Sequence, residues 1–268
     1  MVMAAFRTLL AVLSVALLVP VVVTAQGGDD LKALRQEIES LKTGVADVQR
    51  DVQEIKALLQ GALQGGRQAA APPPPVTPDS REMTVANAHA KGSAGSRLVL
   101  VEFSDFQCPF CARHAKQTMP QLEREYVDTG KLRYVMRNLP LTQIHPDAVR
   151  AASAAECAGD QGKYWQMHEK LFGHQQALGA ADLTRYAQES GVEPKAFQQC
   201  MDANRHEAKI RQDLAEALNA GVNSTPTFFL GFAEGDGKAK IVRRVSGAHP
   251  YPVFKAAIEG LLAEAAKK

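Results

Sequence analysis

The feature that most constrains the fold is a Cys-x-x-Cys pair at the point where a predicted strand passes into a predicted helix. The stretch "SRLVLVEF" (96–103) is short, apolar and rich in β-branched residues, which indicates a strand buried on both faces. Cys108 and Cys111 follow it, and Pro109 stands where a helix tolerates proline best, at its first position. Two cysteines this close hold a metal, staple the fold or carry out chemistry.

The surrounding pattern predicts an α/β fold that closes with a hairpin and a helix. Further strands are expected at 131–138, 225–231 and 240–247, with a Gly-Asp-Gly turn between the last two. Helical patterns cover residues 109–128 and 252–268. Several more helical segments are predicted between about 146 and 220, and the last of them is one long helix from 194 to 220. The order is therefore strand, helix, strand, helical block, hairpin and helix.

This order resembles the thioredoxin fold with an inserted helical subdomain, and the chain is similar to the DsbA-like family of exported thiol-disulfide oxidoreductases. Four stretches between residues 84 and 264 carry the resemblance: "VEFSDFQCPFC", "IHPDAVRAASAAECAGDQGKYWQMHEKLF", "GVNSTPTFFLG" and "VSGAHPYPVF". It implies a DsbA-like thioredoxin domain at 81–268 with a helical insertion at about 146–220. It also implies an enzyme that exchanges disulfides with extracytoplasmic proteins and a redox partner protein, with no cofactor beyond the redox-active Cys108–Cys111 disulfide.

Physical chemistry gives the two cysteines different roles. Cys108 is expected at the N-cap of the helix, where unpaired backbone N–H groups and the helix dipole favour an anion. Its thiol should therefore ionise more readily than that of a free cysteine, and the thiolate is the attacking nucleophile. Cys111, one turn further on, is then the more buried resolving thiol. A zinc site is disfavoured, because there is no second close cysteine pair and the seven histidines lack a matching spacing.

The resemblance also implies a substrate surface around the cysteines. Pro226, preceded by Thr225, matches the family's cis-proline, and the backbone of Thr225 would pair with an extended substrate strand. Pro109 and Phe110 are assigned to the same surface. The alternative for Pro226 is an ordinary trans proline that opens a strand.

We make a separate prediction for each of two polar residues near the cysteines, Glu102 and His114. The resemblance implies that Glu102 is a buried carboxyl that moves protons to and from Cys111. The alternative is a strand-end glutamate in water. His114, one helical turn past Cys111, could stabilise a thiolate, but it is expected to be a solvated helix residue.

The remaining cysteines are Cys157 and Cys200, both in the predicted helical insertion. If Cys108 and Cys111 cycle together, Cys157–Cys200 is the only pairing left for a structural disulfide. Such a bridge would stabilise the fold by roughly 4 kcal/mol on the chain-entropy estimate. The alternative is two separately buried free thiols.

Residues 1–25 indicate the cellular compartment in which the chain functions. An uncharged, largely apolar run ends in Val-Thr-Ala, which fits a secretory signal cleaved after Ala25. The alternative is an uncleaved membrane anchor over residues 8–25, because the run approaches the length of a membrane span. Either would export the chain to a periplasmic or other extracytoplasmic space, where disulfides are permitted. The formal net charge of +2 gives no indication of a nucleic-acid surface.

Residues 30–60 carry the heptad of a coiled coil. Apolar side chains occupy every a and d position: Leu31, Leu34, Ile38, Leu41, Val45, Val48, Val52, Ile55 and Leu59. In a parallel assembly Asp30 meets Arg35, Glu37 meets Lys42 and Asp51 meets Lys56, whereas antiparallel pairing sets like charges together. We therefore expect a parallel homo-oligomer, a dimer or a trimer, through residues 31–59. The alternative is an amphipathic helix that folds back on its own domain.

A linker rich in Pro, Ala and Gly at 61–80 is expected to hold the domain away from the coil. Several active sites on one coil would act on one substrate at raised effective concentration. The resemblance favours an oxidase, and the coil makes a disulfide isomerase or reductase the alternative. A third hypothesis is a non-catalytic oligomeric scaffold or holdase.

Overall fold

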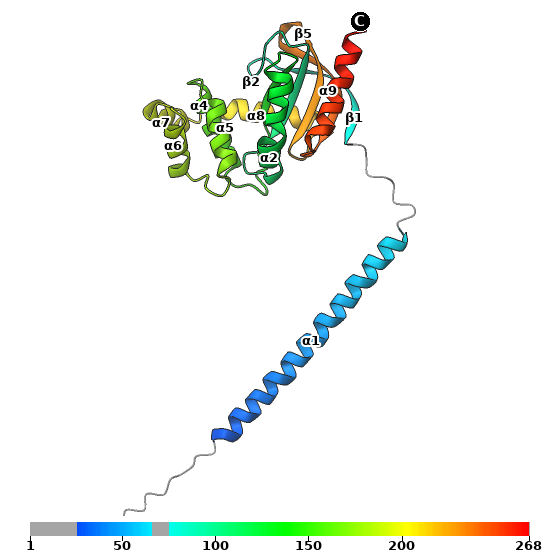
Figure 1. Cartoon of the computed structure of the whole chain (residues 1–268). Helices are drawn as coiled ribbons and strands as arrows, with labels where there is room; N and C mark the ends of the chain where they lie inside the picture. The colour runs from blue at the N-terminus through cyan, green and yellow to red at the C-terminus, as the bar shows by residue number, and fades with distance from the viewer. Residues whose placement is uncertain (1–25, 66–74, 268) are drawn as a thin grey trace, which may run out of the picture. The chain divides into compact units, whose positions relative to one another are not determined.

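The computed structural model describes residues 26–65 and 75–267, which fall into two units that divide between residues 71 and 72 (Figure 1). The predicted signal or anchor at 1–25 and residues 66–74 of the predicted linker lie outside the described residues. None of the helices in the described ranges combines the length and the apolarity that a membrane span requires.

The first unit contains one long helix, α1 (Gln26–Gly65). The helix extends beyond the predicted coil at both ends, so the predicted start of the linker at 61 is wrong. At the C-terminal end the extension contains the good helix formers Ala62, Leu63 and Gln64. Its apolar heptad side chains are exposed wherever the structure describes them: Leu34, Ile38, Leu41, Val45, Val48, Val52 and Ile55. Within its own unit, α1 therefore leaves these seven side chains uncovered.

The second unit is built on a six-stranded mixed sheet in the order β1-β6-β5-β3-β4-β2. The strands are β1 (Val76–Thr84), β2 (Ala90–Lys91), β3 (Leu98–Ser104), β4 (Leu132–Asn138), β5 (Thr227–Glu234) and β6 (Lys238–Ser246). Only β3 and β4 pair in parallel, and the other neighbours are antiparallel. Every residue of β3 is buried, as the apolar run at 96–103 predicts.

The sheet has two edge strands that the sequence analysis missed. β1 pairs with β6 and begins at Val76, so the predicted boundaries of the linker at 80 and of the domain at 81 are wrong by five residues. Pro78 lies at an irregularity in the pairing, between Pro78 and Arg81. Proline is tolerated there because an edge strand leaves one side of its backbone unpaired.

The helices that follow β3 and β4 match most of the predicted helical segments. A continuous helix follows β3 in the chain and consists of α2 (Pro109–Arg113), η1 (His114–Thr118), α3 (Met119–Leu122) and η2 (Glu123–Val127). The segments η1 and η2 are π-helical. The later helices are α4 (Ala148–Gly159), α5 (Tyr164–Gly173), α6 (Ala180–Glu189), α7 (Pro194–Asp202), α8 (Glu207–Asn219) and α9 (Tyr251–Ala265). The single run predicted from 194 is broken between α7 and α8, where Asn204 adopts a positive φ of 47°.

Two apolar clusters cover the two faces of the sheet. Leu98 and Leu100 of β3 share one cluster with Cys111, the insertion helices and α9. Val99, Val101 and Phe103 point to the other face and join a cluster that includes Ala217 of α8. The alternation of faces along β3 places Glu102 on the same face as Leu98 and Leu100, which is the face that carries Cys111.

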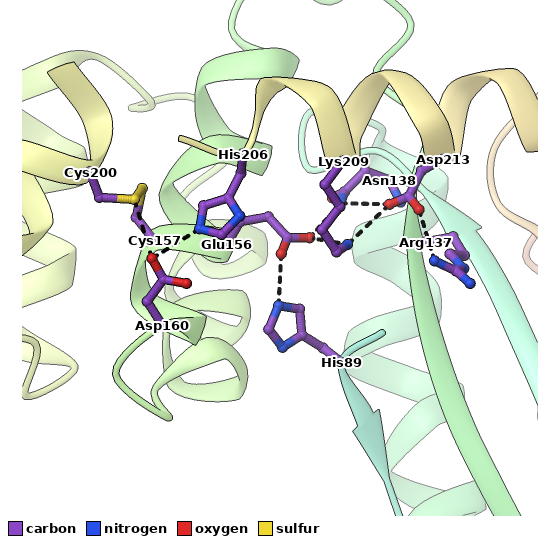
Figure 2. A network of polar contacts seen from close by, with 10 residues as sticks. All are labelled: His89, Arg137, Asn138, Glu156, Cys157, Asp160, Cys200, His206, Lys209 and Asp213. Carbon is purple, nitrogen blue, oxygen red and sulfur yellow. Dashed lines mark hydrogen bonds and ion pairs between the residues drawn. A yellow bond between two sulfur atoms is a disulfide. The ribbon is translucent and has the colours of Figure 1, made fainter. Parts of the chain in front are cut away.

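A buried polar network joins the insertion to the sheet (Figure 2). Glu156 of α4 lies at its centre and accepts hydrogen bonds from Asn138 Nδ2 at 2.7 Å and Lys209 Nζ at 2.7 Å, while His89 Nε2 lies 2.8 Å from its other oxygen. Asp213 of α8 accepts bonds from Asn138 and Arg137 at the end of β4. Burial alone would raise the pKa of Glu156, but His89 and Lys209 outweigh it and lower that pKa to about 2.

Candidate active site

Cys108 and Cys111 lie where β3 passes into α2. Cys108 has extended backbone angles (φ −70°, ψ 121°) and is the N-cap of α2, whose first residue is Pro109, while Cys111 lies in its first turn. Both cysteines are free thiols in the structure. The site is therefore a dithiol at the start of a helix.

The two thiols differ strongly in acidity. A hydrogen bond from the Cys111 thiol is the largest contribution and lowers the pKa of Cys108 to about 6; the amides of Phe110 and Cys111 act in the same direction. Burial is the main reason that the pKa of Cys111 lies well above its ordinary value. The arrangement therefore makes Cys108 the thiolate and keeps Cys111 protonated at neutral pH.

The loop before β5 lies against Cys108. The Thr225–Pro226 peptide bond is cis, and the carbonyl oxygen of Thr225 lies 3.4 Å from Cys108 Sγ. Phe110, two residues after Cys108, is 53% exposed, and the Arg113 guanidinium lies 5.2 Å from the centre of its ring. A thiolate, a backbone carbonyl and an exposed aromatic ring thus occur together at one surface.

Glu102 lies beneath the dithiol and is only 1% exposed, so the alternative of a glutamate in water does not apply. Burial is the largest influence and raises its pKa to about 7, although a hydrogen bond from Tyr134 opposes that rise. Its charge interacts with both Cys108 and Cys111. A carboxyl that titrates near neutral pH can both accept and donate a proton there.

Two residues of the site were not predicted correctly from the sequence: His114 and Tyr134. The prediction that His114 is solvated is wrong: it is 1% exposed, because Phe228 of β5 and Phe254 of α9 pack against its ring. Tyr134 of β4 was not singled out, because its contact with Glu102 depends on the pairing of β4 with β3, which no local pattern reveals. Its hydroxyl donates a hydrogen bond to Glu102.

The loop between β3 and α2 is held by Gln175 of the helical insertion and by Leu141 and His145, which precede the insertion. Gln175 Nε2 donates to the carbonyl oxygens of Phe106 at 2.7 Å and of Cys108 at 2.9 Å. Asp105 accepts hydrogen bonds from the backbone N–H of Leu141 and lies 2.8 Å from His145 Nδ1. These contacts therefore fix the backbone on which the nucleophile stands, a role that no local sequence signal reveals for Gln175.

Cys157 of α4 and Cys200 of α7 form a disulfide (Figure 2). Both are buried, and His206 and Asp160 lie beside them, with His206 Nε2 3.0 Å from Asp160 Oδ2. The two sulfurs and the His206 nitrogen lie within 4.8 Å of one another. Because the sulfurs are bonded to each other, they do not provide the thiolates that a metal requires.

Comparison with known proteins gives a consistent picture of the second unit. The family model described as Thioredoxin matches residues 84–240. The solved structure of BdbD from Bacillus subtilis in its oxidised form is 19% identical, with a TM-score of 0.59 over 68% of this chain and 97% of that one. Alpha-DsbA1 of Wolbachia pipientis is 23% identical, with a TM-score of 0.57 over 68% and 94%. The predicted thioredoxin-like fold with a helical insertion is confirmed.

A thioredoxin-like oxidoreductase from Silicibacter pomeroyi is 27% identical over 66% of this chain and 94% of that one, with a TM-score of 0.55. Curated relatives match over shorter parts of their length. The Na(+)/H(+) antiporter NhaA 3 of Salinispora tropica is 40% identical over 142 residues, which are 53% of this chain and 21% of the relative. The chain therefore spans about a fifth of the length of such relatives.

Proposed function

Because the chain belongs to the thioredoxin family and has the DsbA-type fold, we propose that it is an exported protein disulfide oxidoreductase. Its substrates are proteins with thiols or disulfides, and a second protein restores its redox state. Residues 1–25 direct it out of the cytoplasm, as a cleaved signal or as an anchor. The single observation that carries this proposal is the contrast between an acidic Cys108 and a protonated Cys111 beside the Thr225 carbonyl.

The acidity of Cys108 favours the oxidising direction. Its pKa is lowered from 9.0 to about 6, so the thiolate stabilises the reduced fold fully above pH 9, and this contribution is lost as the pH falls through 6. At pH 7 this contribution is on the order of 1 kcal/mol, or a few tens of millivolts for a two-electron couple. A stabilised reduced form makes the disulfide the better oxidant.

Substrate binding in this proposal relies on the surface around Cys108. An extended substrate strand pairs with the backbone of Thr225, next to Pro226, while Pro109 and the exposed Phe110 contact its side chains. Backbone pairing of this kind accepts many sequences. Glu102 takes the proton from Cys111 or returns it as the disulfide forms or breaks.

The first test is Cys111→Ser. We expect this variant to accumulate a mixed disulfide between Cys108 and a substrate protein, because the resolving thiol is absent. Mass spectrometry of the trapped species locates the bond, and Cys108→Ser is the matched control that should trap little. A substrate bound covalently to Cys111 in the control, with none on Cys108 in the first variant, would reverse the two roles.

Oligomerisation through α1 is the second part of the proposal. The apolar side chains of its heptad are exposed in the single chain, and a second copy would cover them. The pairs Asp30 with Arg35, Glu37 with Lys42 and Asp51 with Lys56 favour parallel copies. Such copies present several dithiols to one substrate, which suits the repeated attack of a disulfide isomerase or reductase.

Deletion of residues 27–64 tests this second part. We expect the deleted chain to sediment as a monomer and to lose most of its ability to refold a protein with scrambled disulfides, while it still oxidises a dithiol peptide at the full-length rate. A full-length chain that sediments as a monomer, or a deletion that leaves both activities unchanged, would show that the coil takes no part in the chemistry.

A further inference from the structure

The two oxygens of the Glu102 carboxyl have different surroundings. Oε2 accepts a hydrogen bond from the hydroxyl of Tyr134. Oε1 is buried and has no partner at normal hydrogen-bond distance among the residues that the structure describes, although the Ser104 hydroxyl faces the carboxyl and lowers its pKa. A buried carboxyl oxygen without a partner is rare, because its desolvation is not compensated. Only Oε1 is therefore open to a proton that comes from a thiol.

Tyr134 is itself held from the other side by His114. The Nε2 atom of His114 lies 3.0 Å from the Tyr134 hydroxyl oxygen. Burial raises the pKa of Tyr134 well above its ordinary value and lowers the pKa of His114 to about 3, so the phenol keeps its proton and the imidazole is neutral. Since the only phenol proton is donated to Glu102, His114 must donate its Nε2–H to the phenol oxygen.

We propose that Tyr134, held by His114, is a positioning residue that fixes Glu102 so that Oε1 exchanges the proton with Cys111. The inference rests on the proposed role of Glu102 and extends it to two residues for which no role has been assigned. Tyr134 donates to Oε2 whether Oε1 is protonated or not, so the carboxyl does not rotate during the cycle.

The proton and the electrons balance in the oxidising direction. A substrate thiolate attacks Cys108 Sγ of the enzyme disulfide, the bond between Cys108 and Cys111 breaks, and Cys111 leaves as a thiolate that takes the proton from Oε1 of Glu102. A second substrate thiolate breaks the mixed disulfide and releases Cys108. The substrate dithiol loses the two electrons that the enzyme disulfide gains, and Glu102 recovers its proton when Cys111 is reoxidised.

The groups around Glu102 determine which ionisations a pH experiment on this carboxyl detects. The groups that face it are Tyr134 from β4, Tyr164 from α5, Ser104 from β3, and Cys108 and Cys111 from the start of α2. His114 reaches it through Tyr134, and His168 of α5 in turn faces His114. Of these groups, Glu102 and Cys108 are those whose pKa values lie near neutral pH, at about 7 and about 6.

The test is the single-turnover rate at which the oxidised protein oxidises a dithiol peptide, divided by the fraction of the peptide that is thiolate and followed from pH 5 to 9. The rate is expected to fall above the pKa of Glu102, and Glu102→Gln should lack that fall. Tyr134→Phe keeps the ring but removes a bond that favours the carboxylate, so the fall should move up by about one pH unit, a tenfold change in the ionisation constant. His114→Phe, which keeps an aromatic ring beside Phe228, should move it less in the same direction.

Two comparisons separate positioning from a structural effect. Tyr126→Phe is the matched control, because that hydroxyl donates to the Glu259 carboxylate at 2.8 Å and should not affect the profile. Tyr134→Phe should have no further effect in the Glu102→Gln background. A fall that stays in place in Tyr134→Phe and His114→Phe, or an equal effect of Tyr134→Phe with and without Glu102, would overturn the inference. If Cys111→Ser traps substrate but Glu102→Gln keeps the fall, disulfide exchange stands and the proton role of Glu102 is wrong.

Discussion

Replacement of both Cys157 and Cys200 by Ala is expected to lower the free energy of unfolding by about 4 kcal/mol. The two positions are 43 residues apart, and a bridge between them removes the entropy of a loop of that length from the unfolded chain. The bridge also ties α4 to α7 inside the helical insertion. A loss of this size is a large part of the stability of an ordinary domain.

Urea unfolding at pH 7 measures this loss, with Cys108 and Cys111 changed to Ser in both chains so that thiol exchange does not interfere. The matched control compares the Cys108→Ser/Cys111→Ser variant with the oxidised wild type. Their unfolding free energies should be similar, since a bridge across two residues restricts the unfolded chain little. Equal unfolding free energies with and without Cys157 and Cys200 would contradict the prediction. So would a Cys157 peptide that is alkylated in unfolded, unreduced protein.

Glu156→Gln is expected to lower the free energy of unfolding at pH 7 by about 3 kcal/mol. The pKa of this carboxyl is lowered from 4.5 to about 2, so its ionisation stabilises the fold above about pH 4.5, and this contribution is lost as the pH falls towards 2. The variant lacks the charge that His89 and Lys209 face. The difference between wild type and variant should therefore shrink over the same pH range.

Unfolding free energies of both chains between pH 2 and 7 test this prediction. Glu189→Gln is the control, because Glu189 pairs with Lys170 and Arg185 at an exposed position of α6, where ion pairs contribute little. Equal losses for the two variants at pH 7 would place the stabilisation elsewhere. A difference that persists at pH 2 would show that packing, rather than charge, makes Glu156 important.

Local patterns in the sequence predict the central part of the domain well. The buried strand before Cys108, the helix start at Pro109 and the Gly-Asp-Gly turn each depend on neighbouring residues, and the structure has them at or close to the predicted positions. β1 was missed because its Pro78 reads as part of a linker, and only its distant partner β6 makes it a strand. Pairing across the whole domain has no local signal.

The site shows the same division between local and distant information. The acidity of Cys108 follows first from the hydrogen bond of the Cys111 thiol and then from the amides at the helix start, and a Cys-x-x-Cys pair before a predicted helix indicates both. The burial of His114 does not, because a polar residue on a helix is solvated unless other elements cover it, and β5 and α9 do so here. The Tyr134 bond to Glu102 likewise depends on β3 and β4 being parallel neighbours.

The edges of the sheet have a consequence for a protein that exchanges disulfides with other proteins, as we propose, because a substrate that lacks its disulfides can be unfolded. One edge is β1, where Pro78 and a register irregularity interrupt the ladder, and the other is β2, which is only two residues long. Edges interrupted or shortened in this way are poor templates for further strands. An unfolded chain is therefore offered backbone pairing at Thr225 rather than along a sheet border, and high concentrations of clients should not draw the protein into β-aggregates.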